Sequence, residues 1–436
     1  MSDEVRALST RVIDPRAAAK GFVLVACAGA LMIWWLAESL WRDADVATEA
    51  TRALRRLADP EPPRPPNPVR PVAILLLDGL RVDEAARLPA MQAFREGART
   101  GNLLFPSPTF STGAYHALVT GAPNHLTGVS TNRYHVLTNG GVARVDTLGD
   151  RVRALGGRER YVGEDLDWLL QLLTPSPAAR DTVPIREFDA TVQRDLEAFA
   201  ASDAPGLLVA HLLWVDESAH EGGVNSVAHR AALARADALI AALHQRQREQ
   251  PALVALVLAD HGHVTAGGHG GDEPEVQRAP FALRAEGLEP GLHEDLPPEC
   301  IPRLITLASG LPTPRSSVCT RFDIPPPARL LERAAYAGDA ARRQRLYHEA
   351  RTTGLLGLTM LLTLMGLGAT KRSFSGLDAA SLVTPLVWLA GAVLAHRVLL
   401  QKPFTLSAMH LVRPHLAVVG TLSALAAAVG VALGTV

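Results

Sequence analysis

Excess charge of either sign is missing from this sequence. Its 436 residues include 43 lysines and arginines against 44 acidic residues, which gives a formal net charge of −1. Proteins that bind nucleic acids usually carry a clear excess of positive charge, because the phosphate backbone dominates that affinity. The composition therefore provides no electrostatic basis for a nucleic-acid partner.

Cysteine is also scarce, with three residues in the whole chain. Cys27 lies in an apolar run near the N-terminus, whereas Cys300 and Cys319 share a more polar region. In an oxidising compartment the latter two can form a disulfide, and in a reducing one they would remain buried thiols. The sequence leaves both possibilities open.

A signal-peptide cleavage site is missing from the first apolar run, Gly21–Ala37, since no small-x-small pattern closes it cleanly. The run is long enough to cross a bilayer, and tryptophans at its end resemble an interfacial belt. Three more apolar runs follow near the C-terminus: Gly354–Ala369, Ala379–Ala395 and Leu416–Val436. We therefore expect about four transmembrane helices, one at residues 21–41 and three in a membrane bundle at residues 354–436.

Basic residues predict how these helices are oriented. Arg6, Arg11, Arg16 and Lys20 precede the first run, so the positive-inside rule places residues 1–20 in the cytoplasm. The polar region after the first span is then extracytoplasmic, either periplasmic or on the outer face of a membrane. Basic residues between the last two runs fit this orientation less well, so the topology of the last two helices stays open.

The polar region is expected to hold one catalytic domain, residues 72–322. A juxtamembrane helix and a proline-rich linker precede it at residues 42–71, and an amphipathic connector follows at residues 323–353. Within the domain, "PVAILLLDGL", "GLLVAHLLWVD" and "PALVALVLAD" read as buried strands that alternate with helical patterns. This alternation predicts an α/β fold with a doubly wound, mostly parallel sheet.

An aspartate ends each of these three apolar runs: Asp78, Asp216 and Asp260. The carboxyl ends of strands in an open α/β sheet converge on the binding crevice. Each aspartate alone can be a turn residue or a helix N-cap. Three carboxylates gathered at one edge would repel one another unless cations held them together, which favours a metal site.

Histidines near these aspartates complete a possible ligand set. His220 follows Asp216 by four residues, His261 adjoins Asp260, and His269 lies in the glycine-rich loop "AGGHGG". Three carboxylates and three imidazoles suffice for two divalent ions. His263 is interpreted as a further ligand or, more often, a residue that faces substrate or solvent, and His211 as a core histidine.

The segment "PSPTFSTGAYHALVTG" offers a nucleophile. Its Ser and Thr hydroxyls precede a helix of small residues, so a phosphate bound there would meet backbone N–H groups. A hydroxyl coordinated to a metal loses its proton readily and becomes a nucleophile. The alternative is an ordinary helix N-cap.

Four of these motifs, taken in order, resemble the alkaline phosphatase superfamily. The branch is that of type I phosphodiesterases/nucleotide pyrophosphatases and GPI ethanolamine-phosphate transferases. "AILLLDGLRVDEA" resembles its opening strand, "PTFSTGAYHALVTGAPNHLTGV" its nucleophile helix, "WVDESAH" its D-x-x-x-H element and "ADHGHVTAGGHGG" its DHG…GxHGG element. The resemblance extends from Val72 to Pro314. The sulfatase pattern, Cys-x-Pro-x-Arg, is absent from the sequence.

The resemblance implies two metal positions, with zinc as the expected ion. One would be held by Asp216, His220 and His269. The other would be held by Asp78, Asp260 and His261, with the nucleophile Ser111 bridging toward the pair. Ser111 is placed by counting ten residues back from Gly121, and a shift of two residues would make Thr109 the nucleophile instead.

Further residues are expected to contact substrate: Thr112, Asn132 and His263. The activity implied is a two-step transfer in which a phosphoserine or phosphothreonine forms and then passes its group on. We expect a membrane-anchored transferase that moves a phosphoethanolamine-like headgroup from a phospholipid to a lipid or glycan acceptor. The alternatives are a hydrolase of phosphodiesters or nucleotides and, more remotely, a non-enzymatic membrane scaffold.

Overall fold

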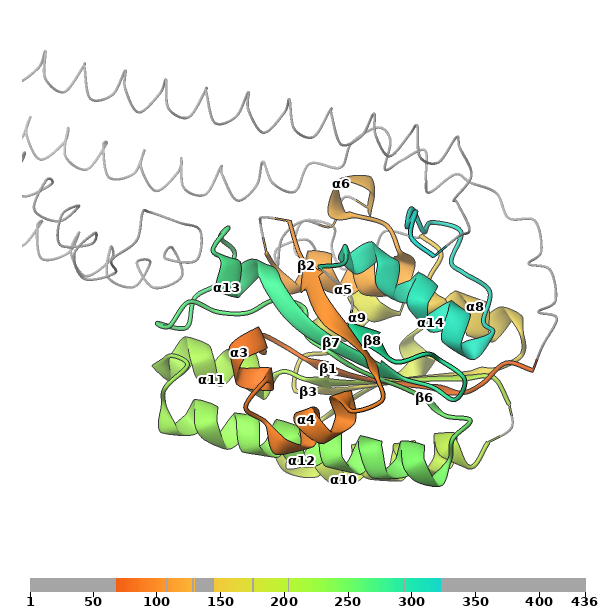
Figure 1. Ribbon diagram of the computed structural model, residues 1–436, viewed down its shortest axis with the longest axis horizontal. Helices are drawn as coiled ribbons and strands as arrows, with labels where there is room; N and C mark the ends of the chain where they lie inside the picture. The colour runs from red at the N-terminus through yellow and green to blue at the C-terminus, as the bar shows by residue number, and fades with distance from the viewer. Residues whose placement is uncertain are drawn as a thin grey trace, which may run out of the picture. The chain divides into compact units, whose positions relative to one another are not determined.

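In a computed structural model of the protein, a sheet of eight strands forms the centre of the described part of the chain (Figure 1). The structure describes residues 68–106, 109–127, 129, 145–174, 176–202, 204–292 and 295–322. The strands are β1 (Val72–Leu77), β2 (Arg99–Leu104), β3 (Arg158–Glu164), β4 (Arg180–Val183), β5 (Gly206–Leu212), β6 (Val254–Leu258), β7 (Arg278–Arg284) and β8 (Gly291–Leu292).

Their order across the sheet is β4-β3-β5-β1-β6-β7-β2-β8. The pairings from β4 to β6 are parallel, as is the pairing of β2 with β8, whereas β7 runs antiparallel to both β6 and β2. Every residue of β1, β5 and β6 is buried. Continuous apolar strands of this kind form where a parallel sheet is covered on both faces.

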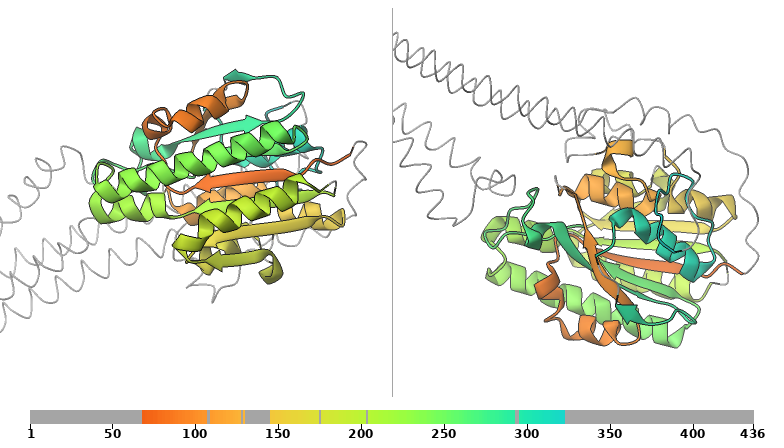
Figure 2. Two further views of the ribbon diagram at one scale, coloured as in Figure 1. Left: turned by 90° about the horizontal axis from the view of Figure 1, so that it is seen from below. Right: turned by 45° about the horizontal axis from the view of Figure 1, so that its top comes forward.

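Helices cover both faces of the sheet, as Figures 1 and 2 show. One face carries α3 (Val82–Ala85), α4 (Pro89–Arg95), α10 (Ile185–Ala200), α11 (Trp214–Gly222) and α12 (Val227–Glu249). The other carries α5 (Ser111–Thr120), α6 (Asn124–Thr127), α8 (Leu148–Ala154), α9 (Asp167–Leu173) and α14 (Ile301–Ser309). The remaining short helices are η2 (Pro177–Ala179), α13 (Pro274–Gln277) and η3 (Pro298–Cys300). The predicted α/β fold with a mostly parallel sheet is confirmed.

Register brings the ends of the three central strands to one edge. Leu77 of β1 pairs with Leu212 of β5, and Leu76 pairs with Leu258 of β6. Asp78 and Asp260, which follow β1 and β6, therefore lie at the same edge of the sheet. The prediction for Asp216 needs a correction, because β5 ends at Leu212 and Asp216 lies in the first turn of α11. The helix begins directly over the carboxyl edge of the sheet, so its first turn still reaches the other two aspartates.

None of the helices among the described residues is long and apolar enough to cross a bilayer. The predicted spans at residues 21–41 and 354–436 lie outside the described residues, as do the linker before residue 68 and the connector after residue 322. The transmembrane helices therefore remain predictions.

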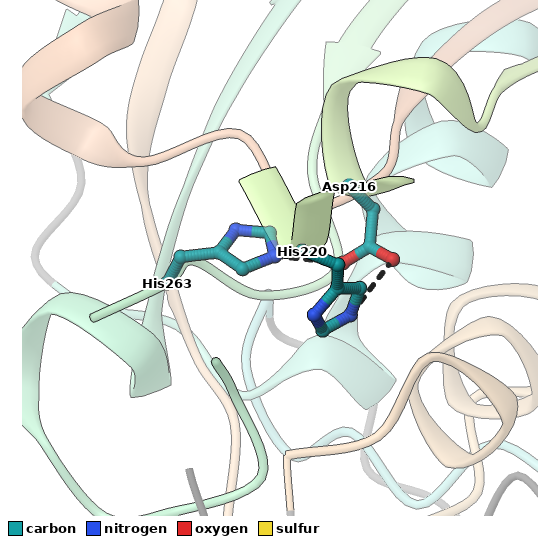
Figure 3. A group of neighbouring side chains, drawn as sticks. All are labelled: Asp216, His220 and His263. Carbon is teal, nitrogen blue, oxygen red and sulfur yellow. Dashed lines mark hydrogen bonds and ion pairs between the residues drawn. The ribbon is translucent and has the colours of Figure 1, made fainter. Parts of the chain in front are cut away.

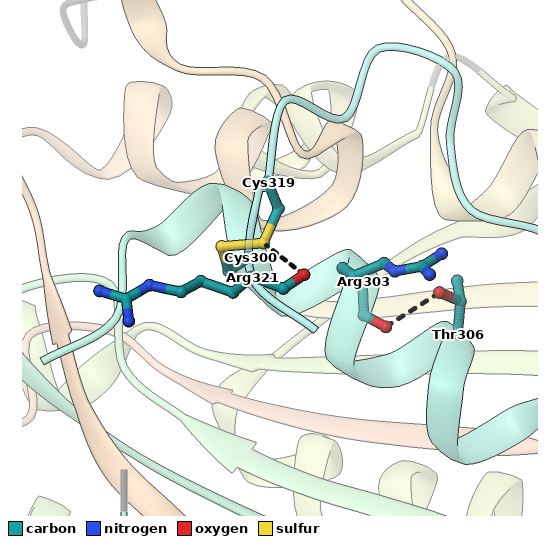
Figure 4. The surroundings of a disulfide bond; sticks show 5 residues. All are labelled: Cys300, Arg303, Thr306, Cys319 and Arg321. Atoms are coloured by element: carbon teal, nitrogen blue, oxygen red, sulfur yellow. Dashed lines mark hydrogen bonds between the residues drawn. A yellow bond between two sulfur atoms is a disulfide. The ribbon is translucent and has the colours of Figure 1, made fainter. Parts of the chain in front are cut away.

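Cys300 and Cys319 form a disulfide, which decides the alternative that the sequence left open (Figure 4). Cys300 ends η3, directly before α14, and Cys319 follows a loop that returns across the end of α5. There the Val318 N–H donates to the Gly121 carbonyl at 2.8 Å, and the Ser316 hydroxyl lies 2.7 Å from the Thr120 carbonyl. The disulfide thus fastens the last described segment onto the C-terminal end of α5.

Replacing both cysteines with serine is expected to lower the free energy of unfolding by about 3 kcal/mol, because the bond closes a loop with a sequence separation of 19. Thermal unfolding of the purified chain, with and without a thiol reductant, provides the measurement. Reductant should lower the transition of the wild type to that of the double variant and leave the variant unchanged. Equal transitions in all four samples would contradict the expectation.

Candidate metal and phosphoryl-transfer site

Three buried carboxylates meet above the carboxyl edge of the sheet. Asp78, Asp216 and Asp260 are 0%, 5% and 0% exposed. Burial, followed by the charge of Asp78, raises the pKa of the Asp260 carboxyl well above its usual range. Such a cluster is stable only where cations or hydrogen bonds compensate the charge.

His261 stands between two of these carboxylates. Its Nε2 lies 3.4 Å from Asp78 Oδ1 and 3.3 Å from Asp260 Oδ2. Both oxygens are buried and have no hydrogen-bond partner within the described part of the chain. The three groups lie close enough together to hold one ion.

The protonation state of His261 indicates which kind of ligand fits between the two carboxylates. Its Nδ1 lies 3.2 Å from the Gly262 carbonyl, which can only accept, so Nδ1 carries the proton. Burial lowers the pKa of His261, so the ring is neutral and its Nε2 is an acceptor. An acceptor nitrogen that faces two orphaned carboxylate oxygens fits a divalent cation. The residues present therefore fit the predicted metal.

A second cluster surrounds Asp216. Its Oδ2 lies 3.2 Å from His220 Nε2, one helical turn further along α11, and its Oδ1 lies 3.7 Å from His269 Nε2. Burial lowers the pKa of His220, but the Asp216 carboxylate outweighs this effect and raises the pKa to about 9. Burial raises the pKa of Asp216, but the surrounding histidines, His220 foremost, hold it well below its usual range.

The structure thus brings together all six Asp and His residues that the sequence analysis selected as ligands. It also places His263 beside Asp216, fully buried. The sequence had left two interpretations of His263 open, a further ligand or a residue that faces substrate or solvent, and the burial excludes a solvent-exposed side chain. Thr112 is buried within α5. Asn132 lies outside the described residues.

Ser111 is the first residue of α5, and its Oγ lies 3.1 Å from His261 Nε2. This distance connects the hydroxyl to the Asp78–Asp260–His261 cluster. The N-terminal turn of a helix directs unpaired N–H groups and positive partial charge outward, so an anion near Ser111 would be stabilised there.

Thr109 makes different contacts. Its hydroxyl lies 3.2 Å from the Gly271 carbonyl and accepts from the Gly270 N–H at 2.9 Å. Its backbone carbonyl accepts from His269 Nδ1 at 2.9 Å. Thr109 therefore fastens the glycine-rich loop and fixes the orientation of the His269 ring, as outer contacts commonly do for metal-binding histidines.

Replacing Thr109 with valine keeps the shape of the side chain but removes the hydroxyl that contacts the Gly271 carbonyl and the Gly270 N–H. We expect the free energy of unfolding to fall by about 1–3 kcal/mol, because both hydrogen bonds of the Thr109 hydroxyl are buried. Urea unfolding of the purified chain provides the measurement. Thr109→Ser retains the hydroxyl and is expected to stay close to the wild type. A valine variant as stable as the serine variant would contradict this role.

Sequence reasoning missed the residues that hold Asp78 in place. Tyr115 lies one turn after Ser111 on α5, and its hydroxyl contacts Asp78 Oδ2. His211 of β5 contacts the same oxygen at 3.2 Å and also the Tyr115 hydroxyl. The interpretation of His211 as a buried, hydrogen-bonded histidine agrees with this position. In the sequence, His211 was marked only by being a polar residue inside an apolar strand, and the structure pairs that strand with β1, which precedes Asp78.

More distant ion pairs anchor α11. Glu164 accepts from the Trp214 N–H at 2.8 Å and pairs with Arg235 of α12. His229 of α12 lies 3.1 Å from the Val215 carbonyl of α11 through its Nδ1 and 2.9 Å from Glu84 of α3 through its Nε2. These contacts connect the helix of Asp216 and His220 to the elements around it, and no local sequence pattern predicts them.

Taken together, the α/β fold, the Asp–His clusters and a hydroxyl at a helix N-terminus define a site suited to phosphoryl transfer. The family model described as type I phosphodiesterase / nucleotide pyrophosphatase matches residues 158–273. This segment contains Asp216, Asp260 and four histidines of the site, namely His220, His261, His263 and His269.

A curated human protein, the catalytic subunit of GPI ethanolamine phosphate transferase 3, is 26% identical over 283 residues. The match covers 57% of this chain and 25% of the relative, so the chain spans about a quarter of that protein's length. The resemblance inferred from the motifs is confirmed. Both matches are to enzymes of phosphoryl-group chemistry, which agrees with the predicted class of phosphodiesterase or phosphotransferase.

Solved structures that match part of this chain include murine ectonucleotide pyrophosphatase / phosphodiesterase 5. It is 12% identical, with a TM-score of 0.42, and the match covers 56% of this chain and 96% of the murine one. A protein in the alkaline phosphatase superfamily from Vibrio parahaemolyticus is 14% identical, with a TM-score of 0.41 and coverage of 60% and 74%.

Proposed function

We propose that the protein is a membrane-anchored, two-metal phosphotransferase that cleaves a phosphodiester through a phosphoserine at Ser111. The observation that carries this proposal is the Ser111 hydroxyl beside His261, whose Nε2 faces the orphaned oxygens of Asp78 and Asp260. Two divalent ions, with zinc as the expected species, would be held by these residues and by the Asp216 cluster. When bound, they would lower the pKa of a coordinated hydroxyl and stabilise negative charge on the transferred group.

The chain's own residues would perform the remaining work. Ser111 Oγ gives up its proton and forms a bond to phosphorus, while the bond from phosphorus to the alcohol of the donor breaks and that alcohol leaves with a proton. The N–H groups at the start of α5 hold the phosphoryl oxygens. In the second step an acceptor hydroxyl takes the group from Ser111, and the serine regains its proton.

Ser111 is a better nucleophile than Thr109 in this geometry. The Thr109 hydroxyl is engaged on both sides by the glycine-rich loop. The Ser111 hydroxyl points to a ring nitrogen that itself faces the carboxylate pair. A hydroxyl must reach both the reacting phosphorus and the group that activates it.

The proposed donor is a phospholipid with a phosphoethanolamine-like headgroup, and the proposed acceptor is a lipid or a glycan. Similarity to a GPI ethanolamine phosphate transferase supports this assignment. Similarity of residues 158–273 to phosphodiesterases favours the second candidate, a hydrolase that passes the group to water. One fold carries both outcomes, so the acceptor has to be tested directly.

The experiment compares two substrates with the full chain purified in detergent and loaded with zinc. A transferase releases diacylglycerol from phosphatidylethanolamine labelled in its headgroup and passes the label to an added glycolipid. A hydrolase cleaves a chromogenic phosphodiester and releases the label into water without an acceptor. Transfer without hydrolysis supports the first candidate. Inactivity toward both substrates, with ions bound, would contradict the proposal.

We also propose that the catalytic domain is extracytoplasmic. The Cys300–Cys319 disulfide supports this placement, because such bonds persist in oxidising compartments. The basic residues before the first apolar run favour the same orientation. Reporter fusions placed after Pro71 and after Phe322 should both report the outer compartment. A cytoplasmic signal from either fusion would contradict it.

A further inference from the structure

His263 lies in the loop after β6 and makes two contacts with other parts of the site. Its Nδ1 lies 2.9 Å from the Gly79 carbonyl, and its Nε2 lies 2.8 Å from Asp216 Oδ1. Because the carbonyl can only accept, Nδ1 donates, and Nε2 is the nitrogen directed at the carboxylate. Figure 3 shows the His263 ring and the His220 ring both directed toward the Asp216 carboxylate.

The surroundings of Asp216 are rich in nitrogen donors. The rings of His220, His263 and His269 lie 5.0–5.5 Å from one another, measured between centroids, around this one carboxylate. Asp216, His220 and His263 form one group whose ligand atoms lie within 4.8 Å of one another, and Asp216, His261 and His269 form another. Ligand atoms about 2.0–2.1 Å from one zinc ion are separated by roughly 3 Å. The Asp216 oxygens lie 2.8 Å from His263 Nε2 and 3.2 Å from His220 Nε2, which suits a shared ion.

Gly79 provides the space that His263 occupies. Its φ of +74° is left-handed, and a Cβ at this position would come within 2.2 Å of His263 Cε1. The Gly79 N–H also donates to Asp260 Oδ1 at 3.0 Å. One glycine at the end of β1 thus orients both His263 and a carboxylate of the other cluster.

Resting on the proposed metal-dependent function, we propose that His263 is a fourth ligand of the ion held by Asp216, His220 and His269. The two metal positions would then differ in chemistry. Three imidazoles and one carboxylate surround the first, whereas the second has Asp78, Asp260, His261 and the Ser111 hydroxyl. Nitrogen-rich sites favour zinc and neighbouring transition metals more strongly than oxygen-rich sites do.

The type of ligand has a further consequence. Both positions would have four protein ligands, but imidazole nitrogens suit zinc better than carboxylate and hydroxyl oxygens do. The position at Asp216 is therefore expected to retain its ion tightly. The position that includes Ser111 is expected to release its ion first and to offer room for the phosphoryl oxygens.

Stepwise chelation of the zinc-loaded full chain tests this inference, with bound zinc per chain measured by mass spectrometry. We expect the wild type to lose one ion at low chelator concentration and to retain the other. In His263→Ala and His263→Gln the retained ion should bind about a hundredfold more weakly or worse. Glutamine keeps hydrogen-bonding capacity toward Gly79 and Asp216 but is a poor zinc ligand, so it separates ligation from folding. His244→Ala, on α12, is the matched control and should behave as the wild type.

A cobalt-substituted chain distinguishes a ligand from a residue that only orients Asp216. If His263 binds the metal, its replacement changes the visible absorption bands of the cobalt, and added imidazole restores them in His263→Ala. Wild-type bands in both variants would overturn the inference, even if affinity fell. Two bound ions with unchanged retention in the variants would overturn it while leaving the proposed function intact. A wild-type chain that binds no metal would contradict the proposed function itself.

Discussion

Replacing Ser111 with alanine is expected to lower the rate of turnover about a thousandfold or more, because the group that bonds to phosphorus is removed. In a zinc-loaded preparation, bound metal should stay close to two ions per chain, since all the Asp and His ligands remain and only the hydroxyl ligand is lost. Rates measured with a chromogenic phosphodiester, together with metal content, provide the check. Loss of activity with intact metal content distinguishes a missing nucleophile from a damaged site.

The covalent intermediate allows a direct measurement at the same residue. Quenching turnover with acid and mapping the labelled peptide should place the phosphoryl group on Ser111 in the wild type and in Thr109→Val. Thr109→Val is informative because it removes the rival hydroxyl and leaves Ser111 in place. A phosphate on Thr109, or full activity in Ser111→Ala, would show that the nucleophile was misassigned.

Asp216→Asn should have a comparable effect for a different reason. The variant retains the size of the side chain but removes the charge that faces His220, His263 and His269. An amide is a weak ligand for zinc, and three imidazoles without a carboxylate bind a divalent ion less tightly. We expect one ion per chain to be lost and activity to fall about a thousandfold or more.

Metal content of the purified variant, measured by mass spectrometry, checks this expectation. Asp237→Asn is a suitable control, because Asp237 accepts from the Ala90 N–H at 2.8 Å and touches none of the cluster. The control should retain two ions and normal turnover. An Asp216→Asn chain that still carries two ions and remains active would exclude Asp216 from the site.

Much of the fold was predictable because the relevant signals are local. The runs that became β1, β5 and β6 are continuously apolar, a pattern typical of strands buried on both faces. The long helix α12 follows its apolar spacing and begins after Ser226, whose hydroxyl accepts from the His229 N–H. The four-residue spacing of Asp216 and His220 corresponds to one turn of α11, which lets both side chains reach one position.

Candidate ligands were recognisable for a related reason. Aspartate and histidine follow buried apolar strands in this sequence. Burying such side chains costs folding free energy, so they are more common at functional sites than in a purely structural core. The clustering of Asp78 and Asp260 at one edge follows from the parallel arrangement of β1 and β6, whereas Asp216 reaches the same edge from the first turn of α11. The sequence by itself therefore determined the class of fold, the edge of the sheet that carries the site and the residue types that compose it.

Tertiary structure decided which of these residues meet and how each is oriented. Thr109 and Ser111 are two residues apart and chemically alike, yet the glycine-rich loop, about 160 residues later, engages one hydroxyl and leaves the other beside His261. His263 was interpreted from the sequence as a further ligand or as a residue that faces substrate or solvent, and the structure places it beside Asp216 because Gly79 leaves space for its ring. Such contacts form between elements that are far apart in the sequence. The direction of a side chain at these contacts is set by tertiary packing and not by local propensity.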